Sequence, residues 1–173
     1  MDKLWSPWRS AYIDSFSKEK KSAACIFCTA AEKKIKSKKS FVVYKGDKSY
    51  IMLNLYPYNS GHLMVIPKRH VSDFLFLSEK ELAEIMDEIK LSIKALNKIM
   101  KPQGFNVGLN LGKAAGAGID QHVHFHIVPR WNGDTNFMPI IGKVKVISQD
   151  LLITKEKLVK EFERLTKEKN NFK

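Results

Sequence analysis

The most regular alternation of apolar and polar positions lies in residues 121–131, where three histidines alternate with three apolar side chains. A repeat of two is typical of a β-strand, because successive side chains point to opposite faces of the sheet. The pattern therefore predicts one face that packs on a core and one polar face that carries imidazoles. The first face is Val123, Phe125 and Ile127, and the second is His122, His124 and His126. We expect the strand to end near Pro129, which has no N–H to donate to a neighbouring strand.

Shorter β-rich runs before this strand predict the rest of a sheet. Gly46 and Asp47 separate the first two runs and predict a hairpin. Pro67 closes the third run, and the fourth leads into a glycine-rich loop at residues 112–118. The four runs are residues 41–44, 50–54, 62–66 and 105–111. With the histidine strand they predict an antiparallel meander of about five strands.

A helical period begins after the third strand. Ser78 and Glu81 form a capping box, and Leu77 with Leu82 fits a hydrophobic staple. Apolar residues then recur at helical spacing, and we assign the whole stripe, methionines included, to the core. We expect the helix to end before Pro102. The stripe is Leu82, Ile85, Met86, Ile89, Ile93, Leu96 and Met100.

Less regular segments flank these elements. Residues 150–169 predict a lysine-rich amphipathic helix, and residues 25–33 predict a short helix. Residues 4–13 are rich in aromatic side chains, which is typical of an arm that packs on the body or on another subunit. Short extended pieces are predicted at 136–141 and 144–147. The expected contacts of the C-terminal helix are Leu152, Ile153, Leu158, Phe162 and Leu165.

These elements predict an α+β fold in which an antiparallel sheet carries one long helix and a C-terminal helix. A length of 173 residues suits one domain. We divide it into an N-terminal arm (1–24), a core (25–131) and a C-terminal extension (132–173). The chain has no apolar run of transmembrane length and no signal-peptide pattern, so we expect a cytoplasmic protein without a membrane partner.

The net charge of +12, from 30 Lys+Arg and 18 Asp+Glu, favours anionic partners such as nucleotides, polyphosphates or nucleic acids. Much of the excess lies in residues 18–39 and 143–173, far from the histidines, so a solvated lysine-rich surface also explains it. The chain lacks the interleaved aromatic and basic residues of a single-strand binding surface. We therefore expect no stable nucleic-acid partner.

Cys25 and Cys28 form a Cys-x-x-Cys pair. One pair in a chain of this length is not a disulfide framework, so the alternatives are a metal site, a redox pair or two ordinary thiols. A redox pair usually lies where a helix begins after a strand, and the sequence around Cys25 does not predict that arrangement. A metal site requires further ligands, for which the histidines are candidates.

Three histidines on one strand face favour a working site over a structural role. Buried together, each imidazole needs a partner, and protonated together they repel one another. Histidine exchanges protons, attacks electrophiles and binds metals near neutral pH. The glycine-rich loop directly before the strand lets backbone N–H groups approach phosphate oxygens, although flexible connections also use glycine.

This combination resembles the histidine-triad (HIT) family of nucleotide hydrolases and transferases, whose motif alternates histidine with apolar residues. The likeness covers roughly residues 25–131, and residues 131–137 and the aromatic arm look like the branch that includes bacterial diadenosine tetraphosphate phosphorylases. The resemblance implies a HIT-like antiparallel sheet. The motifs that carry it are His122-Val123-His124-Phe125-His126-Ile127-Val128, Asn54, Gly61-His62, Ile66-Pro67-Lys68 and residues 106–112.

The resemblance implies covalent catalysis on a dinucleoside polyphosphate such as diadenosine tetraphosphate. His124 would attack the α-phosphorus, and phosphate or water would then release a mononucleotide from the nucleotidyl-histidine. His126 would donate to phosphate oxygens or protonate the leaving group. His62 would join the histidine network or have a structural role.

The family pattern also implies a nucleotide site. Asn54 would bind ribose and Asn110 would orient phosphate or leaving group, although a local hydrogen bond at a turn or strand end explains each asparagine nearly as well. The backbone of Gly116, Ala117 and Gly118 would hold phosphate. The base would lie on apolar residues of the second strand, which are Ile51, Met52 and Leu53.

Many family members with an early Cys-x-x-Cys pair bind structural zinc. The resemblance implies that Cys25, Cys28, His70 and His122 make a closed tetrahedral set without an open position for a water nucleophile. The alternative is that the two thiols have no ligand and His122 only forms a hydrogen bond.

The third motif position is His126, not the glutamine of some transferase-like relatives, which favours a hydrolase or phosphorylase. The loop at 111–118 also lacks the glutamine of the dinucleoside triphosphate hydrolases. Alternative functions are a nucleoside phosphoramidate hydrolase, a nucleotide-binding module with little turnover and, last, a basic nucleic-acid adaptor. Family members are usually dimers, so we expect a homodimer or a higher homo-oligomer.

Overall fold

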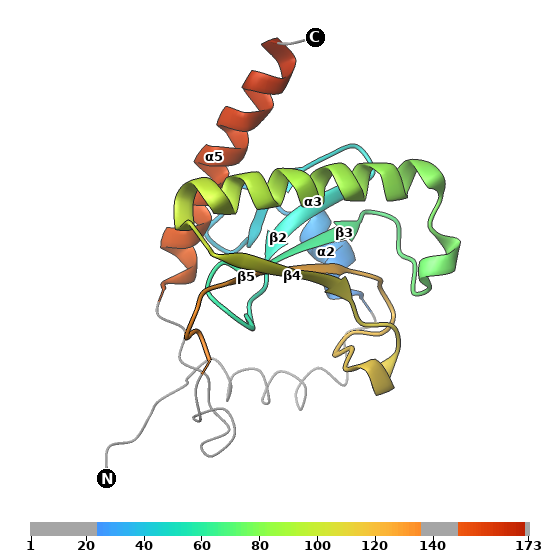
Figure 1. The fold of residues 1–173 in the computed structure, drawn as a ribbon. Coiled ribbons are helices and arrows are strands. Elements are labelled where there is room, and N and C mark those ends of the chain that lie inside the picture. The colour runs from blue at the N-terminus through green and yellow to red at the C-terminus, as the bar shows by residue number, and fades with distance from the viewer. Residues whose placement is uncertain (1–23, 136–148, 172–173) are drawn as a thin grey trace.

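The computed structural model describes residues 24–135 and 149–171 (Figure 1). The arm predicted at 4–13 and the extended pieces predicted at 136–141 and 144–147 lie outside these ranges. The described elements, in chain order, are α2 (Ile26–Glu32), β1 (Val42–Lys45), β2 (Ser49–Leu53), β3 (Leu63–Pro67), the short 3-10 helix η1 (Phe74–Phe76), α3 (Glu79–Met100), β4 (Gly104–Leu109), the 3-10 helix η2 (Lys113–Ala115), β5 (Phe125–Arg130) and α5 (Leu151–Asn171).

The described strands form one antiparallel sheet in the order β1-β2-β3-β5-β4. The hairpin predicted around Gly46 is confirmed, and so is the α+β architecture. The histidine strand β5 lies inside the sheet, because Ile127 pairs with Leu63 of β3 on one side and Val107 of β4 on the other. The residues on β5 are therefore held by two neighbouring strands.

Strand β5 begins later than the predicted strand and ends at Arg130, close to Pro129 as predicted. Regular pairing begins at Phe125, so His122 and His124 precede it in a segment whose side chains still alternate. Pairing continues through Pro129, which lies opposite Phe105 of β4. The N–H and C=O of a strand residue point to the same side, and the carbonyl of Pro129 accepts a hydrogen bond from the Asn59 side chain at 3.0 Å. Proline therefore removes no bond to β4.

The two faces of the sheet support different layers. Helices α3 and α5 cover one face over the larger apolar cluster, which contains Val123, Phe125 and Ile127 as predicted. Helix α2 covers the other face over a smaller cluster built around Phe27 and Tyr50. The histidines alternate with the first set and so lie on the α2 face.

Helix α3 begins as predicted. The N–H of Glu81 donates to Ser78 Oγ at 3.3 Å, and Glu81 Oε2 accepts from the N–H of Ser78 at 2.8 Å. Arg69 adds two hydrogen bonds to the same carboxylate and lowers the pKa of Glu81 to about 2. The chain leaves the helix at Lys101 in a left-handed conformation, next to Pro102.

Helix α3 packs the predicted stripe against the core, with Met86 as the one exception. Met86 is 44% exposed, so its assignment to the core was wrong, whereas Met100 packs against the core. Glu88 and Ser92 are buried in its place, and the Ser92 hydroxyl donates to the Glu88 carbonyl at 2.8 Å. The buried face of α3 therefore includes polar residues that the apolar pattern does not mark.

Helix α5 packs on α3 and β1. Leu158 and Phe162 are buried and Leu165 packs against them, as predicted. Leu152 and Ile153 are 44% and 57% exposed, so these two predicted contacts were wrong. Within residues 24–135 and 149–171, neither of the long helices is apolar enough to cross a bilayer.

Candidate active site and metal centre

The three alternating histidines are buried on the α2 face and do not line an open polar surface. His122, His124 and His126 are 0%, 7% and 8% exposed. The ring of Phe27 lies 4.9 Å from that of His124 and 5.6 Å from that of His122. Burial disfavours a charged imidazole and lowers the pKa of all three side chains, that of His126 to about 4. All three rings are therefore neutral near pH 7.

His122 faces a metal-ligand cluster. Its Nε2 lies 2.9 Å from the carbonyl oxygen of Pro67 and donates to it, which leaves the lone pair on Nδ1. That Nδ1 lies 3.3 Å from the Sγ of Cys25 and 3.7 Å from the Sγ of Cys28. The Nδ1 of His70 lies 3.5 Å from Cys28 Sγ.

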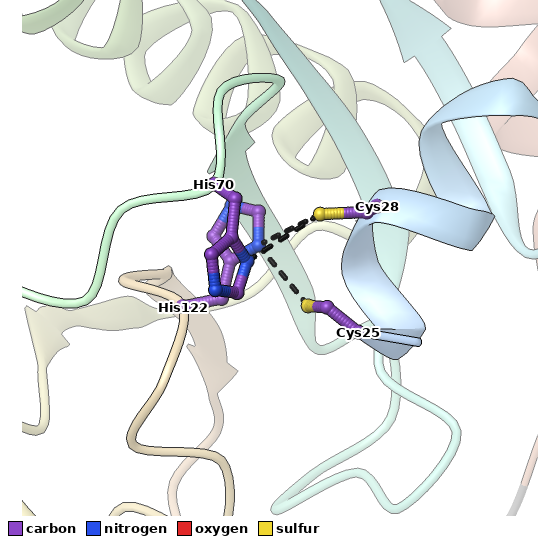
Figure 2. A group of neighbouring side chains, drawn as sticks. All are labelled: Cys25, Cys28, His70 and His122. Atoms are coloured by element: carbon purple, nitrogen blue, oxygen red, sulfur yellow. Dashed lines mark hydrogen bonds between the residues drawn. The ribbon is translucent and has the colours of Figure 1, made fainter. Parts of the chain in front are cut away.

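Figure 2 shows the two cysteines on α2 facing the two histidines, which come from loops on the opposite side. All four ligand atoms lie within 4.8 Å of one another. A tetrahedral zinc ion, with bonds of about 2.3 Å to sulfur and about 2.0 Å to nitrogen, places sulfur and nitrogen ligands about 3.5 Å apart. The donor atoms and their spacing thus fit the predicted Cys2His2 set.

The ring of His124 has the opposite orientation to that of His122. Its Nδ1 lies 2.9 Å from the carbonyl oxygen of His122 and donates to it, so the lone pair is on Nε2. A neutral imidazole with a free Nε2 lone pair is a nucleophile.

His126 belongs to a chain of hydrogen bonds whose direction is fixed by its first donor. The backbone N–H of Tyr58 donates to His62 Nδ1 at 3.0 Å, and the amide of Asn54 lies 3.3 Å from the same nitrogen. His62 must therefore carry its proton on Nε2, which lies 2.9 Å from His126 Nδ1. His126 in turn carries its proton on Nε2.

This Nε2 of His126 has no acceptor. Among the described residues, it is one of only three buried side-chain polar atoms without a hydrogen-bond partner. Buried polar groups are ordinarily paired, and an unpaired one calls for an explanation. The ring of His126 lies 4.8 Å from that of His124, so this donor is held beside the Nε2 lone pair of His124 and is available to an acceptor oxygen of a ligand.

Only some of the predicted nucleotide-binding residues lie on the same face of the sheet as the histidines. Met52 is half-buried on the histidine face, whereas Ile51 and Leu53 are fully buried in the core on the opposite face. The side-chain oxygen of Asn54 accepts from the N–H of Tyr56 at 2.9 Å, and its amide faces His62. Both ends of this side chain are thus engaged in shaping the loop before β3.

The glycine-rich loop folds on itself at η2. The N–H of Gly116 donates to Lys113 at 2.9 Å and that of Ala117 to Gly112 at 3.3 Å. Gly116 has a φ of +89°, which disfavours any residue with a Cβ atom. Ala117 is buried, and Gly118 leads toward the histidines. Asn110 follows β4 directly and is half-buried.

Two residues of the site were missed by the sequence analysis. Phe27, from the turn of α2 that carries the cysteines, packs on His122 and His124. The ring of Tyr58 lies 4.7 Å from that of His62 and 5.5 Å from that of His126. Nothing in the local sequence marks either aromatic side chain, because their contacts depend on how the loops approach β5.

The comparisons with known proteins agree with this geometry. The HIT domain family matches residues 36–133. An AP-4-A phosphorylase of Mycobacterium tuberculosis is 41% identical over 167 residues, which cover 95% of this chain and 86% of that protein. The crystal structure of a hypothetical histidine triad nucleotide-binding protein from Sulfolobus tokodaii is 29% identical with a TM-score of 0.65, covering 82% of this chain and 93% of that one. A Zn-bound histidine triad family protein from Mycobacterium smegmatis also has a TM-score of 0.65, at 24% identity and with 83% and 96% coverage, and supports the fold alone.

Proposed function

Since the chain belongs to the histidine-triad (HIT) family, we propose that it is an enzyme that cleaves dinucleoside polyphosphates such as diadenosine tetraphosphate. The 41% identity to an AP-4-A phosphorylase over most of both chains supports this substrate class. The observation that carries the proposal is the pairing of two neutral rings: His124 with a lone pair on Nε2, and His126 with an unpaired Nε2–H beside it.

His124 is the proposed nucleophile. Its Nε2 forms a bond to the α-phosphorus while the bond from that phosphorus to the bridging oxygen breaks, so diadenosine tetraphosphate releases ATP. Inorganic phosphate then attacks the adenylyl-histidine and gives ADP, whereas water gives AMP. A covalent intermediate divides one difficult displacement into two easier steps. The hydrogen bond from Nδ1 to the His122 carbonyl holds the ring in the tautomer that the attack requires.

His126 is the proposed phosphate ligand. A neutral imidazole is a weak acid, so its Nε2–H serves better as a hydrogen-bond donor to a phosphate oxygen than as the proton source for the leaving group. The buried site strengthens this bond as negative charge develops. His62 is a positioning residue, because it acts through His126: its Nε2–H donates to His126 Nδ1 and fixes which nitrogen of that ring carries the proton.

Four further contacts complete the proposed nucleotide site. Met52 offers an apolar surface for the base on the histidine face. The loop of Gly116, Ala117 and Gly118 precedes the histidine segment in the sequence and would hold the phosphates, with Gly116 supplying the left-handed turn. Asn110 would orient the phosphate chain. We keep Asn54 as a ribose ligand through its loop position, although its side chain also holds His62.

We propose a structural zinc ion at Cys25, Cys28, His70 and His122, which the sulfur–nitrogen spacing supports. Bound there, zinc would supply a fixed cross-link and no chemistry on the substrate, since four protein ligands leave no open position. The chain itself does the rest: Cys25 and Cys28 tie α2 to the segment before β5, and the Pro67 carbonyl fixes the ring of His122.

A homo-oligomer, most simply a dimer, is also proposed. Strand β4 is an edge of the sheet, and Val107 on it and Leu111 just after it are 47% and 51% exposed. An unpaired edge with exposed apolar side chains is a surface on which a second copy can pair. Light scattering of the full chain measures the mass directly.

The experiment that tests the function follows the fate of labelled phosphate. The full chain is incubated with diadenosine tetraphosphate and radiolabelled inorganic phosphate, and the products are separated. Phosphorolysis through adenylyl-His124 gives unlabelled ATP and ADP labelled in its β-phosphate; hydrolysis gives ATP and AMP. Two molecules of ADP without label would contradict attack at the α-phosphorus. If the chain turned over a nucleoside phosphoramidate but not diadenosine tetraphosphate, the proposed substrate class would be wrong.

A further inference from the structure

A cavity lies on the opposite side of the sheet from the histidines. It has a volume of about 820 Å³ and is bounded by α3, α5 and the β1–β2 turn. Helices α3 and α5 lie together over this face of the sheet (Figure 1). None of the proposed catalytic or zinc-binding residues lines it. Its wall holds two lysines, several apolar side chains and five carboxyl groups, which are Asp47, Glu84, Asp87, Glu88 and Glu168.

Glu88 is the unusual member of this wall. It is 3% exposed, and neither of its carboxyl oxygens has a hydrogen-bond partner among the described residues. A buried carboxyl without a partner loses its hydration without compensation, which is why such groups are nearly always paired. The two oxygens of Glu88 and the His126 nitrogen are the only described buried side-chain atoms in this condition.

The other carboxylates around the cavity already have partners. Glu84 accepts from the N–H groups of Lys48 and Ser49, at 2.8 and 3.0 Å. Asp47 pairs with Lys48 at 3.4 Å, and Asp87 pairs with Lys90 at 3.6 Å. Glu168 pairs with Arg164. Glu88 therefore supplies the one uncompensated carboxyl of the wall.

The groups around Glu88 explain its protonation. Its pKa is raised to about 8, first by burial and then by the charge of Glu84 on the same helix. The Ser49 hydroxyl and the N–H of Gly46 lie near it without hydrogen-bond geometry, and together with the charge of Lys68 they only partly offset this rise. Tyr44 on β1 and Glu168 on α5 complete the surroundings. Near neutral pH the empty cavity thus holds a largely uncharged carboxyl that an arriving cation would ionise.

We propose that this cavity binds a linear aliphatic polyamine, with one ammonium group on Glu88 and another on the carboxylates near its mouth. A single metal ion fits less well, because no three carboxylates of the described residues converge on one point. The one group of described side chains close enough to share a metal ion is the cysteine–histidine set. Separated carboxylates match separated charges. Tyr44, Leu91 and Leu165 offer an apolar and aromatic wall for the methylene chain.

The charge of the whole chain makes this proposal specific. At a net charge of +12 the protein repels polycations in general, so saturable binding would report a locally acidic site. Binding also releases the proton of Glu88, which requires affinity to rise as the pH increases toward 8 and to level off above it. Non-specific association has no reason to follow that profile.

The test titrates the full chain, without nucleotide, with spermidine in a calorimeter and by NMR chemical-shift mapping. We expect saturable binding whose shifted amides cluster on α3, α5 and the β1–β2 turn, with affinity increasing from pH 6.5 to 8.5. Glu88→Gln keeps the shape and should weaken binding about tenfold or more and remove the pH dependence. Glu79→Gln, an exposed position on the same helix with the same change in charge, is the matched control and should bind as the wild type does.

A second variant keeps the proposal testable if Glu88→Gln does not fold. Thr166→Lys places a tethered ammonium group at the cavity wall and should compete with spermidine. Three results would overturn the proposal: no saturable binding by the wild type, equal affinities of the Glu88→Gln and Glu79→Gln variants, or shifted amides away from the cavity. None of these measurements depends on the catalytic activity.

Discussion

The two ends of the histidine segment carry the same side chain on the same face, yet they present different ring nitrogens. At His122 the Pro67 carbonyl takes the Nε2 proton, so Nδ1 faces the two thiols. At His126 the Nδ1 accepts from His62, so the Nε2 proton is left for a ligand. Both rings are buried and neutral. The partner that holds one nitrogen therefore decides what the other nitrogen can do.

Replacing the central histidine should give the largest effect, because it removes the proposed nucleophile between these two ends. His124→Asn keeps an amide N–H that can donate to the His122 carbonyl but has no equivalent of Nε2. We expect turnover of diadenosine tetraphosphate to fall on the order of 10³-fold or more, with the melting temperature nearly unchanged. A steady-state assay and a thermal melt measure the two quantities. Retained turnover would exclude His124 as the nucleophile.

Removing the proposed zinc ion should break the His122 end and spare the hydrogen bonds of the His126 end. A chelator, or Cys28→Ala, should lower the free energy of unfolding by about 4 kcal/mol when free zinc had been near 1,000 times its Kd. Denaturant unfolding with and without chelator measures this difference, and a colorimetric zinc assay gives the stoichiometry. The chelator should have no effect on Cys28→Ala, and an identical response of wild type and variant would count against a structural metal.

Acid should weaken the fold at the His126 end. The pKa of this ring in the folded chain, about 4, lies below its ordinary value of about 6.5, so the unfolded chain takes up the proton first. Its contribution to stability is complete above pH 6.5 and is lost as the pH falls toward 4, at a cost of about 3 kcal/mol. Unfolding curves across this range measure the slope.

His126→Gln is the control for that slope, because it removes the titrating group. The stability of this variant should fall less steeply between pH 6.5 and 4 than that of the wild type. Parallel pH profiles for the two proteins would place the acid sensitivity elsewhere.

Changing His62 should give the smallest effect, and it tests the tautomer of His126 most directly. His62→Phe removes the donor to His126 Nδ1 and should lower kcat about 10- to 100-fold, with a smaller change in KM. His62→Gln can place its amide nitrogen where Nε2 lies and should recover much of this loss. If both variants lose the same activity, His62 matters for packing and not for the tautomer of His126.

The regular elements could be predicted because local signals decided them. The capping box at Ser78 fixed the start of α3, the turn at Gly46 fixed the hairpin, and the alternation around Phe125 fixed which face is core. The exposure of Met86 could not be predicted, since Glu88 is polar yet buried beside the β1–β2 hairpin, and Ser92 is buried with its hydroxyl on the Glu88 carbonyl. Leu152 and Ile153 failed for a related reason, because contacts with α3 and β1 determine the orientation of α5.

The candidate site was predicted in its residue types but not in its geometry. The ligand set of Cys25, Cys28, His70 and His122 follows from the family pattern, and the structure brings the four together. The tautomers do not follow from the pattern, because they depend on backbone groups at Pro67, His122 and Tyr58. Partners of that kind are supplied by the main chain and leave no trace in residue identity.

The chain of hydrogen bonds that orients His126 begins at a main-chain amide, that of Tyr58. Every amino acid except proline brings the same N–H to that position, so mutational drift at residue 58 can change the aromatic contact with the imidazoles without reversing the polarity of the chain. A side-chain donor would have lost its proton to many ordinary replacements. The backbone conformation of the loop at residue 58 therefore sets the orientation of His126, and the side chain at residue 58 can change as long as that conformation is kept.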